Sequence, residues 1–305
     1  MEKVKQFKKI LKKIGFDGYI VPKNDEFFCE YIENYNDRLK YISNFSGSYG
    51  IALILKNKNY LFVDGRYTLQ ARKECKSLFS VKTIPGEMPN KILKKKKFRI
   101  GYDPKLFTKK TIKIFFSKTN CKFIPINGNL IDRMWVRKKL KSNSKFYVLP
   151  NNITGQSSNS KIKKMIKILK RKGADFQFIT ASENNAWLLN IRGKDTDYTP
   201  LPKSYLLLNK NNKIYFFCDL KKITSSFRRK FKNIKFEGLN KISFILSKIK
   251  NKKFFIDQNT CSIFFEKLIL KNNKIVENKD PIYFLKSIKT KKEINNIKRA
   301  HVYDG

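Results

Sequence analysis

The chain has 305 residues, of which 41% are hydrophobic and 14% aromatic, and this composition excludes an intrinsically disordered protein. Its formal net charge is +44, because 68 Lys and Arg outnumber 24 Asp and Glu. The basic residues, mostly Lys, are spread over the whole chain, a pattern that favours solvation of exposed faces over nucleic-acid binding as the main function.

Cysteine usage and the apolar runs limit the class of protein further. The five cysteines have no CxxC spacing, so the sequence predicts neither a disulfide framework nor a zinc site. The start MEKVKQFKKILKK has no apolar core of signal-peptide length, and no apolar run approaches the roughly 18–20 residues that span a bilayer. We therefore expect a soluble, cytoplasmic chain with no membrane partner.

The first distinctive stretch is DRLKYISNFSGSYG at 37–50. It predicts a short helix over 37–43, then a Ser/Gly loop and the strand IALIL. A phosphate-binding loop would follow a strand and open a helix, so this order argues against one. We expect Gly47 and Gly50 to permit tight turning and close packing. Arg38 could clamp a carboxylate or carbonyl, but residue type alone favours a surface ion pair with Asp37 or Glu33.

The next motif is DGRY at 64–67, which follows the apolar run YLFV. Asp64 is well placed to cap a helix over RYTLQARKEC by accepting hydrogen bonds from its free amides. Arg66 is expected to be a structural partner for nearby acidic residues.

The second half of the chain repeats the first. VKQFKKILKKIGFDGYIV at 4–21 corresponds to IKKMIKILKRKGADFQFI at 162–179, and both combine helical spacing with a Gly stop, an Asp and a strand. Hairpins are predicted at LKNKNY and NKNNKI, and the strand–Asp segments KFRIGYDP and KKFFIDQN also match. A repeat of about 150–160 residues indicates a duplicated domain, here a three-layer α/β domain with a mixed sheet.

Domain limits follow from the turn-rich segment VLPNNITGQSSNS at 148–160. We expect the first domain at 1–150 and the second at 151–289. Residues 290–305 begin an amphipathic helix that the chain end cuts short, as in a truncated protein.

Catalytic constellations are missing from the sequence. WLLNIRGKDTDYTP at 187–200 places Arg192, Asp195 and Asp197 in a predicted loop. The two carboxylates could ligate a hard cation, but the lack of further acids nearby favours a turn. His301 is the only histidine, so a Ser or Cys nucleophile has no other candidate base, and no metal-binding His spacing occurs. The residues alone predict no catalytic and no metal-ligating side chain.

Three motifs together resemble a known family. The segment 25–71, with its RLKYISNFSGSYG and VDGRYTLQA stretches, resembles the first domain of cytosolic-type Xaa-Pro aminopeptidases (aminopeptidase P) of the creatinase/prolidase group. AWLLNIRGKDTDYTP resembles the signature of the second domain, with Thr199 in place of the usual Asn. KTKKEINNIKRAHVYDG resembles the linker and opening helix of the catalytic domain.

This resemblance implies a fold and an activity. The fold would be two tandem creatinase N-terminal-type domains of ribonuclease-H-like topology, followed by the start of a pita-bread catalytic domain. The activity would be removal of the residue that precedes proline at a peptide N-terminus. Two divalent metal ions, manganese in most of the family, would be held by the missing third domain. The chain itself would be inactive and would restrict access, position the peptide and support a homodimer.

One functional residue is carried over by the resemblance. The Arg of the family's RL motif reaches toward the active-site peptide and aligns with Arg38, which implies that Arg38 binds substrate. In the same stretch Asn44 and Tyr49 replace a Gly and a small residue of the family pattern. The alternative is a non-enzymatic module of the same fold that binds a protein or a polyanion.

Overall fold

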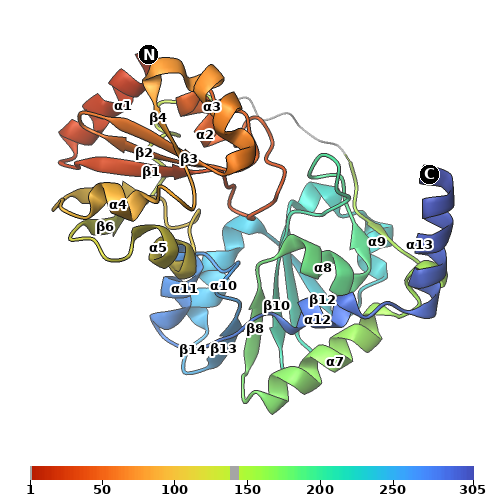
Figure 1. The fold of residues 1–305 in the computed structure, drawn as a ribbon. Helices are drawn as coiled ribbons and strands as arrows, with labels where there is room; N and C mark the ends of the chain where they lie inside the picture. The colour runs from red at the N-terminus through yellow and green to blue at the C-terminus, as the bar shows by residue number, and fades with distance from the viewer. Residues whose placement is uncertain (1, 138–143) are drawn as a thin grey trace. The chain divides into compact units, whose positions relative to one another are not determined.

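The computed structural model describes residues 2–137 and 144–305 (Figure 1). The chain divides into two compact units, Met1–Leu140 and Lys141–Gly305. The division thus falls after Leu140, whereas the sequence placed it at 150. The short strand β7 (Tyr147–Val148) explains the difference, because it pairs with β9 (Ile191–Arg192) of the second unit.

The first unit is built around a six-stranded mixed sheet in the order β4-β3-β2-β1-β5-β6. Its strands are β1 Gly18–Pro22, β2 Ile51–Leu55, β3 Asn59–Val63, β4 Ser80–Thr83, β5 Arg99–Tyr102 and β6 Lys122–Pro125. Its helices are α1 Glu2–Lys13, α2 Arg38–Ser43, α3 Thr68–Cys75, α4 Pro89–Leu93 and α5 Lys109–Phe116, with 3-10 turns η1 Gly65–Tyr67 and η2 Lys76–Leu78. β1 and β2 are buried at every position, as expected for strands covered on both faces.

The second unit has a second six-stranded mixed sheet, in the order β12-β11-β10-β8-β13-β14. Its strands are β8 Phe176–Ile179, β10 Tyr205–Asn209, β11 Ile214–Cys218, β12 Ile234–Gly238, β13 Lys253–Ile256 and β14 Lys274–Glu277. Its helices are α6 Asn151–Thr154, α7 Ser158–Arg171, α8 Ser182–Leu189, α9 Ser225–Arg229, α10 Ile242–Lys248, α11 Ile263–Leu270, α12 Pro281–Ser287 and α13 Lys291–Asp304, with 3-10 turns η3 Leu220–Lys222 and η4 Leu239–Lys241.

The two sheets have the same topology, which confirms the duplicated α/β domain. In each sheet the strand that follows the first long helix lies centrally, antiparallel to one neighbour and parallel to the other. The predicted hairpins connect β2 to β3 and β10 to β11. The helix predicted at the end of the chain is α13, which opens with a capping box between Thr290 and Glu293.

Apolar helix faces cover the sheets and form the cores. In the first unit Val4, Phe7 and Leu11 of α1 are buried in the same cluster as Tyr19 of β1. Across residues 2–137 and 144–305, every helix is too short or too polar to cross a membrane.

Both units fix the carboxyl end of one parallel strand with a buried aspartate. Asp103 follows β5 and accepts hydrogen bonds from the backbone N of Lys105 (2.9 Å) and from Asn129 Nδ2 (3.0 Å). Asp257 follows β13 and accepts from the backbone N of Asn259 and of Asp280, both at 2.8 Å. In each unit the aspartate therefore ties a later segment of the chain to the end of the sheet.

Asp280 continues this closure in the second unit. It caps α12 through a hydrogen bond from Ile282 N (3.0 Å), and it also accepts from Gln177 Nε2 (3.0 Å) and Asn184 Nδ2 (2.8 Å). Burial raises the pKa of Asp280 to about 6, although these donors oppose the shift.

This raised pKa predicts that the loss of unfolding free energy caused by Asp280→Asn depends on pH. Because the folded pKa lies above that of the unfolded chain, ionisation destabilises the fold as pH rises from about 4 to about 6. Asn does not ionise, so its cost in unfolding free energy should shrink by roughly 2 kcal/mol between about pH 4.5 and about pH 7. Urea unfolding followed by Trp187 fluorescence in a Trp135→Phe background measures this. A cost that is constant with pH would contradict it, and Asp197→Asn, at an exposed site, is the matched control.

Candidate functional site

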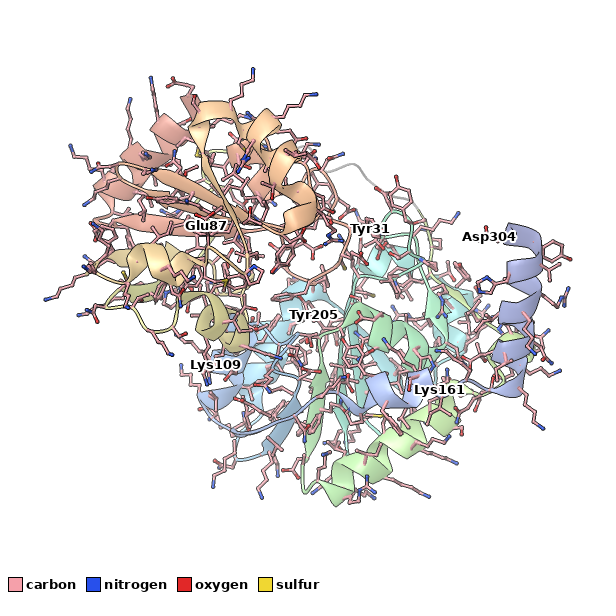
Figure 2. All side chains as sticks on the ribbon, in the orientation of Figure 1. Tyr31, Glu87, Lys109, Lys161, Tyr205 and Asp304 are labelled. Atoms are coloured by element: carbon pink, nitrogen blue, oxygen red, sulfur yellow. The ribbon has the colours of Figure 1, made fainter. Side chains whose placement is uncertain are left out.

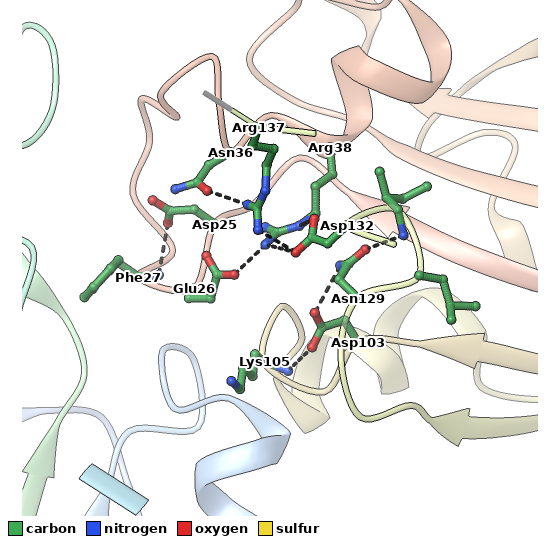
Figure 3. A network of polar contacts seen from close by, with 12 residues as sticks. Asp25, Glu26, Phe27, Asn36, Arg38, Asp103, Lys105, Asn129, Asp132 and Arg137 are labelled. Carbon is green, nitrogen blue, oxygen red and sulfur yellow. Dashed lines mark hydrogen bonds and ion pairs between the residues drawn. The ribbon is translucent and has the colours of Figure 1, made fainter. Parts of the chain in front are cut away.

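The candidate site is a buried ion-pair network around Arg38, at the start of α2 (Figure 3). Asp37 caps this helix by accepting a hydrogen bond from Lys40 N (3.0 Å) and forms an ion pair with Lys23. Asp37 is therefore occupied by other partners. The carboxylate of Glu33 accepts from the hydroxyl of Tyr35 at 2.7 Å. The local partners that residue type favoured for Arg38 are thus not the ones that it contacts.

Arg38 instead binds two carboxylates from other segments. Its Nε and Nη2 donate to the two carboxylate oxygens of Asp132, each at 2.9 Å, and Nη2 also donates to Glu26 Oε1 at 2.6 Å. The Arg38 side chain is only 2% exposed, against 23% for Asp132 and 32% for Glu26. The bidentate geometry fixes the plane of the guanidinium.

A second arginine completes the network from its more exposed side. Arg137 Nη2 donates to Asp132 Oδ2 at 2.8 Å, and its Nη1 donates to Asn36 Oδ1 at 2.9 Å. Asp132 thus joins a buried arginine and a partly exposed one, and Asn36 anchors the second of these to the segment before α2 (Figure 3).

The charges in this network stabilise one another. Burial alone would lower the pKa of Arg38, but Asp132 and Glu26 together raise it above its usual value. Burial opposes ionisation of Glu26, yet the charge of Arg38 holds the pKa of Glu26 below its ordinary range. Arg38 and Glu26 are therefore both charged at neutral pH.

One nitrogen of the buried guanidinium remains available as a hydrogen-bond donor. Arg38 Nη1 has no hydrogen-bond partner among the described residues, although it is shielded from solvent. An unsatisfied buried donor costs free energy, and a carbonyl or carboxylate oxygen would relieve that cost. The site can therefore accept one more hydrogen-bond acceptor.

Glu26 and Asp132 are presented by separate pieces of backbone. Asp25 Oδ1 accepts from the backbone N of Phe27 (3.0 Å) and of Cys29 (3.2 Å), which shapes the turn that carries Glu26. Asn129 Oδ1 accepts from Ile131 N at 2.9 Å while its Nδ2 binds Asp103, and this places the segment that carries Asp132. Sequence reasoning missed both carboxylates. The available signal for Asp132 was its place in the segment NLIDRMWVRKK at 129–139, which has a loose counterpart in DPIYFLKSIKTKKE at 280–293.

The Ser/Gly loop after α2 has a structural role. Asn44 ends the helix with φ +65°, a left-handed conformation that Asn tolerates in place of Gly. A Cβ at Gly47 would approach the Phe45 ring to 2.3 Å, so only glycine fits there. The backbone N and Oγ of Ser46 both donate to the carboxylate of Glu74, at 2.7 and 2.6 Å. Since a protein carboxylate already holds this amide, the loop is not a phosphate cradle.

The DGRY motif is also structural, as predicted. Asp64 caps η1 by accepting from Arg66 N at 3.0 Å, and the Arg66 side chain pairs with the same carboxylate at 2.7 Å. The Arg66 side chain is 73% exposed.

In the second unit the motif WLLNIRG is organised by a buried lysine. Lys161 Nζ donates to Asn190 Oδ1 (2.6 Å) and to the backbone O of Trp187 (2.9 Å), and it lies 4.1 Å from the centroid of the Trp187 ring. Burial lowers the pKa of Lys161 to about 8. Arg192 Nη1 donates to the backbone O of Ile191 at 2.9 Å.

The two aspartates of this motif do not converge. Asp195 is buried, pairs with Lys222 and accepts from Lys203 N at 2.8 Å, whereas Asp197 is exposed. No group of three or more His, Cys, Asp or Glu in residues 2–137 and 144–305 could hold a metal ion.

Two of the buried cysteines, Cys75 and Cys218, are poor nucleophiles. Burial raises the pKa of Cys75 to about 11 and of Cys218 to about 12, so both thiols are protonated and weakly nucleophilic at neutral pH. His301 is exposed on α13.

Comparisons with protein families match both units. One model described as the Creatinase/Prolidase N-terminal domain matches residues 3–134, and a second model with the same description matches residues 137–293. These matches agree with the resemblance carried by the sequence motifs.

Similar proteins are longer than this chain. Xaa-Pro aminopeptidase ApepP of Drosophila melanogaster is 33% identical over 95% of the chain and 50% of its own length. Xaa-Pro aminopeptidase 1 of Dictyostelium discoideum is 29% identical over 100% of the chain and 51% of its own length. The chain thus spans about half the length of the curated relatives it matches.

A solved structure shows the same fold. The X-prolyl aminopeptidase from Caenorhabditis elegans, described as a cytosolic enzyme with a di-nuclear active site, superposes with a TM-score of 0.87. The match covers 98% of this chain and 53% of that one, at 24% identity.

The ion-pair network predicts that Arg38→Lys is costly to stability. Lysine keeps the charge but cannot make the bidentate contact, so the unfolding free energy of the first unit should fall by roughly 2–3 kcal/mol. Urea unfolding followed by Trp135, which stacks on Tyr41 at 4.6 Å, in a Trp187→Phe background reports on this unit.

The matched control is Arg66→Lys, at an exposed arginine that also pairs with an aspartate. It should leave the unfolding curve unchanged, because exposed ion pairs contribute little. Equal losses for the two substitutions would contradict a special role of the buried network.

Proposed function

Since the chain belongs to the creatinase/prolidase N-terminal domain family, we propose that it forms the amino-terminal half of a Xaa-Pro aminopeptidase, an enzyme that removes the residue preceding proline from a peptide N-terminus. The observation that carries this proposal is the match of 95–100% of the chain to about half of relatives named for that activity. The non-enzymatic binding module is not favoured, because those relatives are named as aminopeptidases.

The catalytic chemistry belongs to another part of such an enzyme. The described residues do not fit a metal centre, since Asp195 is neutralised by Lys222 and Asp197 stands apart from it. The two divalent metal ions expected for the activity, manganese by resemblance, would therefore be held elsewhere. The description of the C. elegans enzyme as di-nuclear supports two ions, and its description as cytosolic supports a cytoplasmic location.

The two units would then restrict access, position the peptide and support a homodimer. Their substrate would be a peptide with proline at its second position. The rigid cores and the closures at Asp103 and Asp257 suit a positioning role, because they hold surface groups in fixed places.

Arg38 is the residue that we propose to contact the peptide. Asp132 and Glu26 fix its guanidinium, and the unpartnered Nη1 supplies a donor that a peptide carbonyl oxygen would satisfy. A donor that is already dehydrated and oriented loses little on binding, which is the advantage of preorganisation.

The first test concerns the natural polypeptide that contains this chain. An antibody against the chain should detect a protein of about twice its 36.1 kDa, and the purified protein should release Arg from Arg-Pro-Pro when supplied with Mn²⁺. The 305-residue chain alone should not, because residues 2–137 and 144–305 contain no group of side chains that could hold a metal ion. Turnover by the chain alone, or a natural protein of its own size, would contradict the proposal.

The second test concerns Arg38 in that natural protein. Loss of one oriented hydrogen bond should raise KM for Arg-Pro-Pro about tenfold in Arg38→Lys, measured per folded molecule. Arg137→Lys is the control, because Arg137 binds the same Asp132 but its Nη1 is occupied by Asn36. An unchanged kcat/KM in Arg38→Lys, or an equal rise in KM in the control, would remove the substrate-contact assignment.

A further inference from the structure

A basic hollow lies in the second unit, at the end of the sheet where β8, β13 and β14 begin. These three strands are parallel, so their amino-terminal ends and the turns before them lie together (Figure 1). The hollow has a volume of about 870 Å³. The residues that line it are Gly173, Asp175, Lys250, Asn251, Lys252, Lys253, Leu270, Lys271, Asn272, Asn273 and Lys274.

The backbone of this hollow is held by hydrogen bonds between its turns. Asn273 Oδ1 accepts from Lys252 N (3.0 Å), and its Nδ2 donates to Ile249 O (2.8 Å). Asn251 N donates to Asn272 O, and Lys274 N to Lys252 O, each at 2.9 Å. The lysine side chains therefore extend from a fixed frame.

The charge of the hollow is strongly positive. Five of its eleven lining residues are exposed lysines, more than twice the share of lysine in the whole chain. In residues 2–137 and 144–305 none of the five has a carboxylate at ion-pair distance, although the charge of Lys252 acts on Asp175. The one acid, Asp175, is already bound by Lys210 Nζ (2.7 Å) and Lys253 N (2.9 Å). Five like charges around one hollow repel one another, and a multiply charged anion would relieve that repulsion.

The side chains that line the hollow limit the kind of anion that could bind there. Lysine ammonium groups are point donors that suit tetrahedral phosphate oxygens from several directions. No aromatic side chain lines the hollow, so bases have no surface on which to stack, which disfavours single-stranded nucleic acid and nucleotides held by their base. Leu270 is the one apolar side chain of the lining, which leaves little area for an apolar ligand.

We propose that this hollow binds a compact polyphosphate anion, held by Lys250, Lys252, Lys253, Lys271 and Lys274. The site is separate from the Arg38 network, which belongs to the other unit, and it does not depend on the aminopeptidase activity. Its ligand would be a small molecule or group with several linked phosphates.

The duplicated domain supplies a matched control for this proposal. The segment KKKKF at 94–98 precedes β5 as KNK at 250–252 precedes β13, and Lys95 and Lys97 are exposed like Lys252. Replacement of two lysines by Gln in either turn region removes the same charge. It leaves the backbone hydrogen bonds in place.

The experiment is titration of the chain with inorganic tripolyphosphate at about 150 mM salt, where diffuse attraction to exposed lysines is largely screened. We expect one site per chain, a loss of affinity of at least tenfold in Lys252→Gln/Lys274→Gln, and less than a twofold change in Lys95→Gln/Lys97→Gln. Citrate should compete poorly, because it carries less negative charge than tripolyphosphate at neutral pH.

Three outcomes would overturn the proposal. They are the absence of saturable binding, equal losses in the two double variants, and binding of a DNA duplex that tripolyphosphate does not displace. Circular dichroism of the variants establishes that each is folded, and aminopeptidase activity plays no part in the readout.

Discussion

Burial of the Arg38 charge is the constraint on which the candidate site depends. An isolated guanidinium inside a protein is unstable, so the first unit has to bring carboxylates to it. Asp132 comes from 94 residues away and Glu26 from the loop before α2. The start of α2, the turn at residues 25–29 and the segment after β6 are thereby placed relative to one another. A site of this kind exists only when the whole unit is folded, which explains why no short motif contains it.

In the second unit the same end of the sheet is closed by Asp257 and Asp280, and no arginine among its described residues is buried. Asp257 takes the place of Asp103 at the strand end, and Asp280 is bound by the neutral amides of Gln177 and Asn184. The two units thus stabilise the same topology with different polar contacts. The first unit uses a network of charged side chains, and the second uses hydrogen bonds from side-chain amides. Among the described residues of the second unit no arginine takes this place, so the arginine network is a feature of the first unit and not of the topology that the two units share.

The sequence predicted what depends on local pattern and failed where distant residues meet. Helical spacing located α1 and α7, polar turns located both hairpins, and Asp64 was recognised as a cap, because each signal lies within a few residues. The partners of Arg38 were sought at Asp37 and Glu33, since one sequence shows only neighbours along the chain. The domain limit shifted for the same reason, because the pairing of Tyr147 with Arg192 is invisible before folding.

The lysine residues are the clearest example of side chains that are distant in sequence and close in the structure. Along the chain the lysines are dispersed, and many side chains that end in nitrogen project outward from each unit (Figure 2). Parallel strands, however, bring the turns that precede them to the same end of the sheet. Lys252 and Lys274, twenty-two residues apart, thereby come to line one hollow, with the backbone of one bonded to the other. Dispersed charge therefore says little about binding until the topology is known. The excess of lysine can solvate most of the surface and still converge at one place.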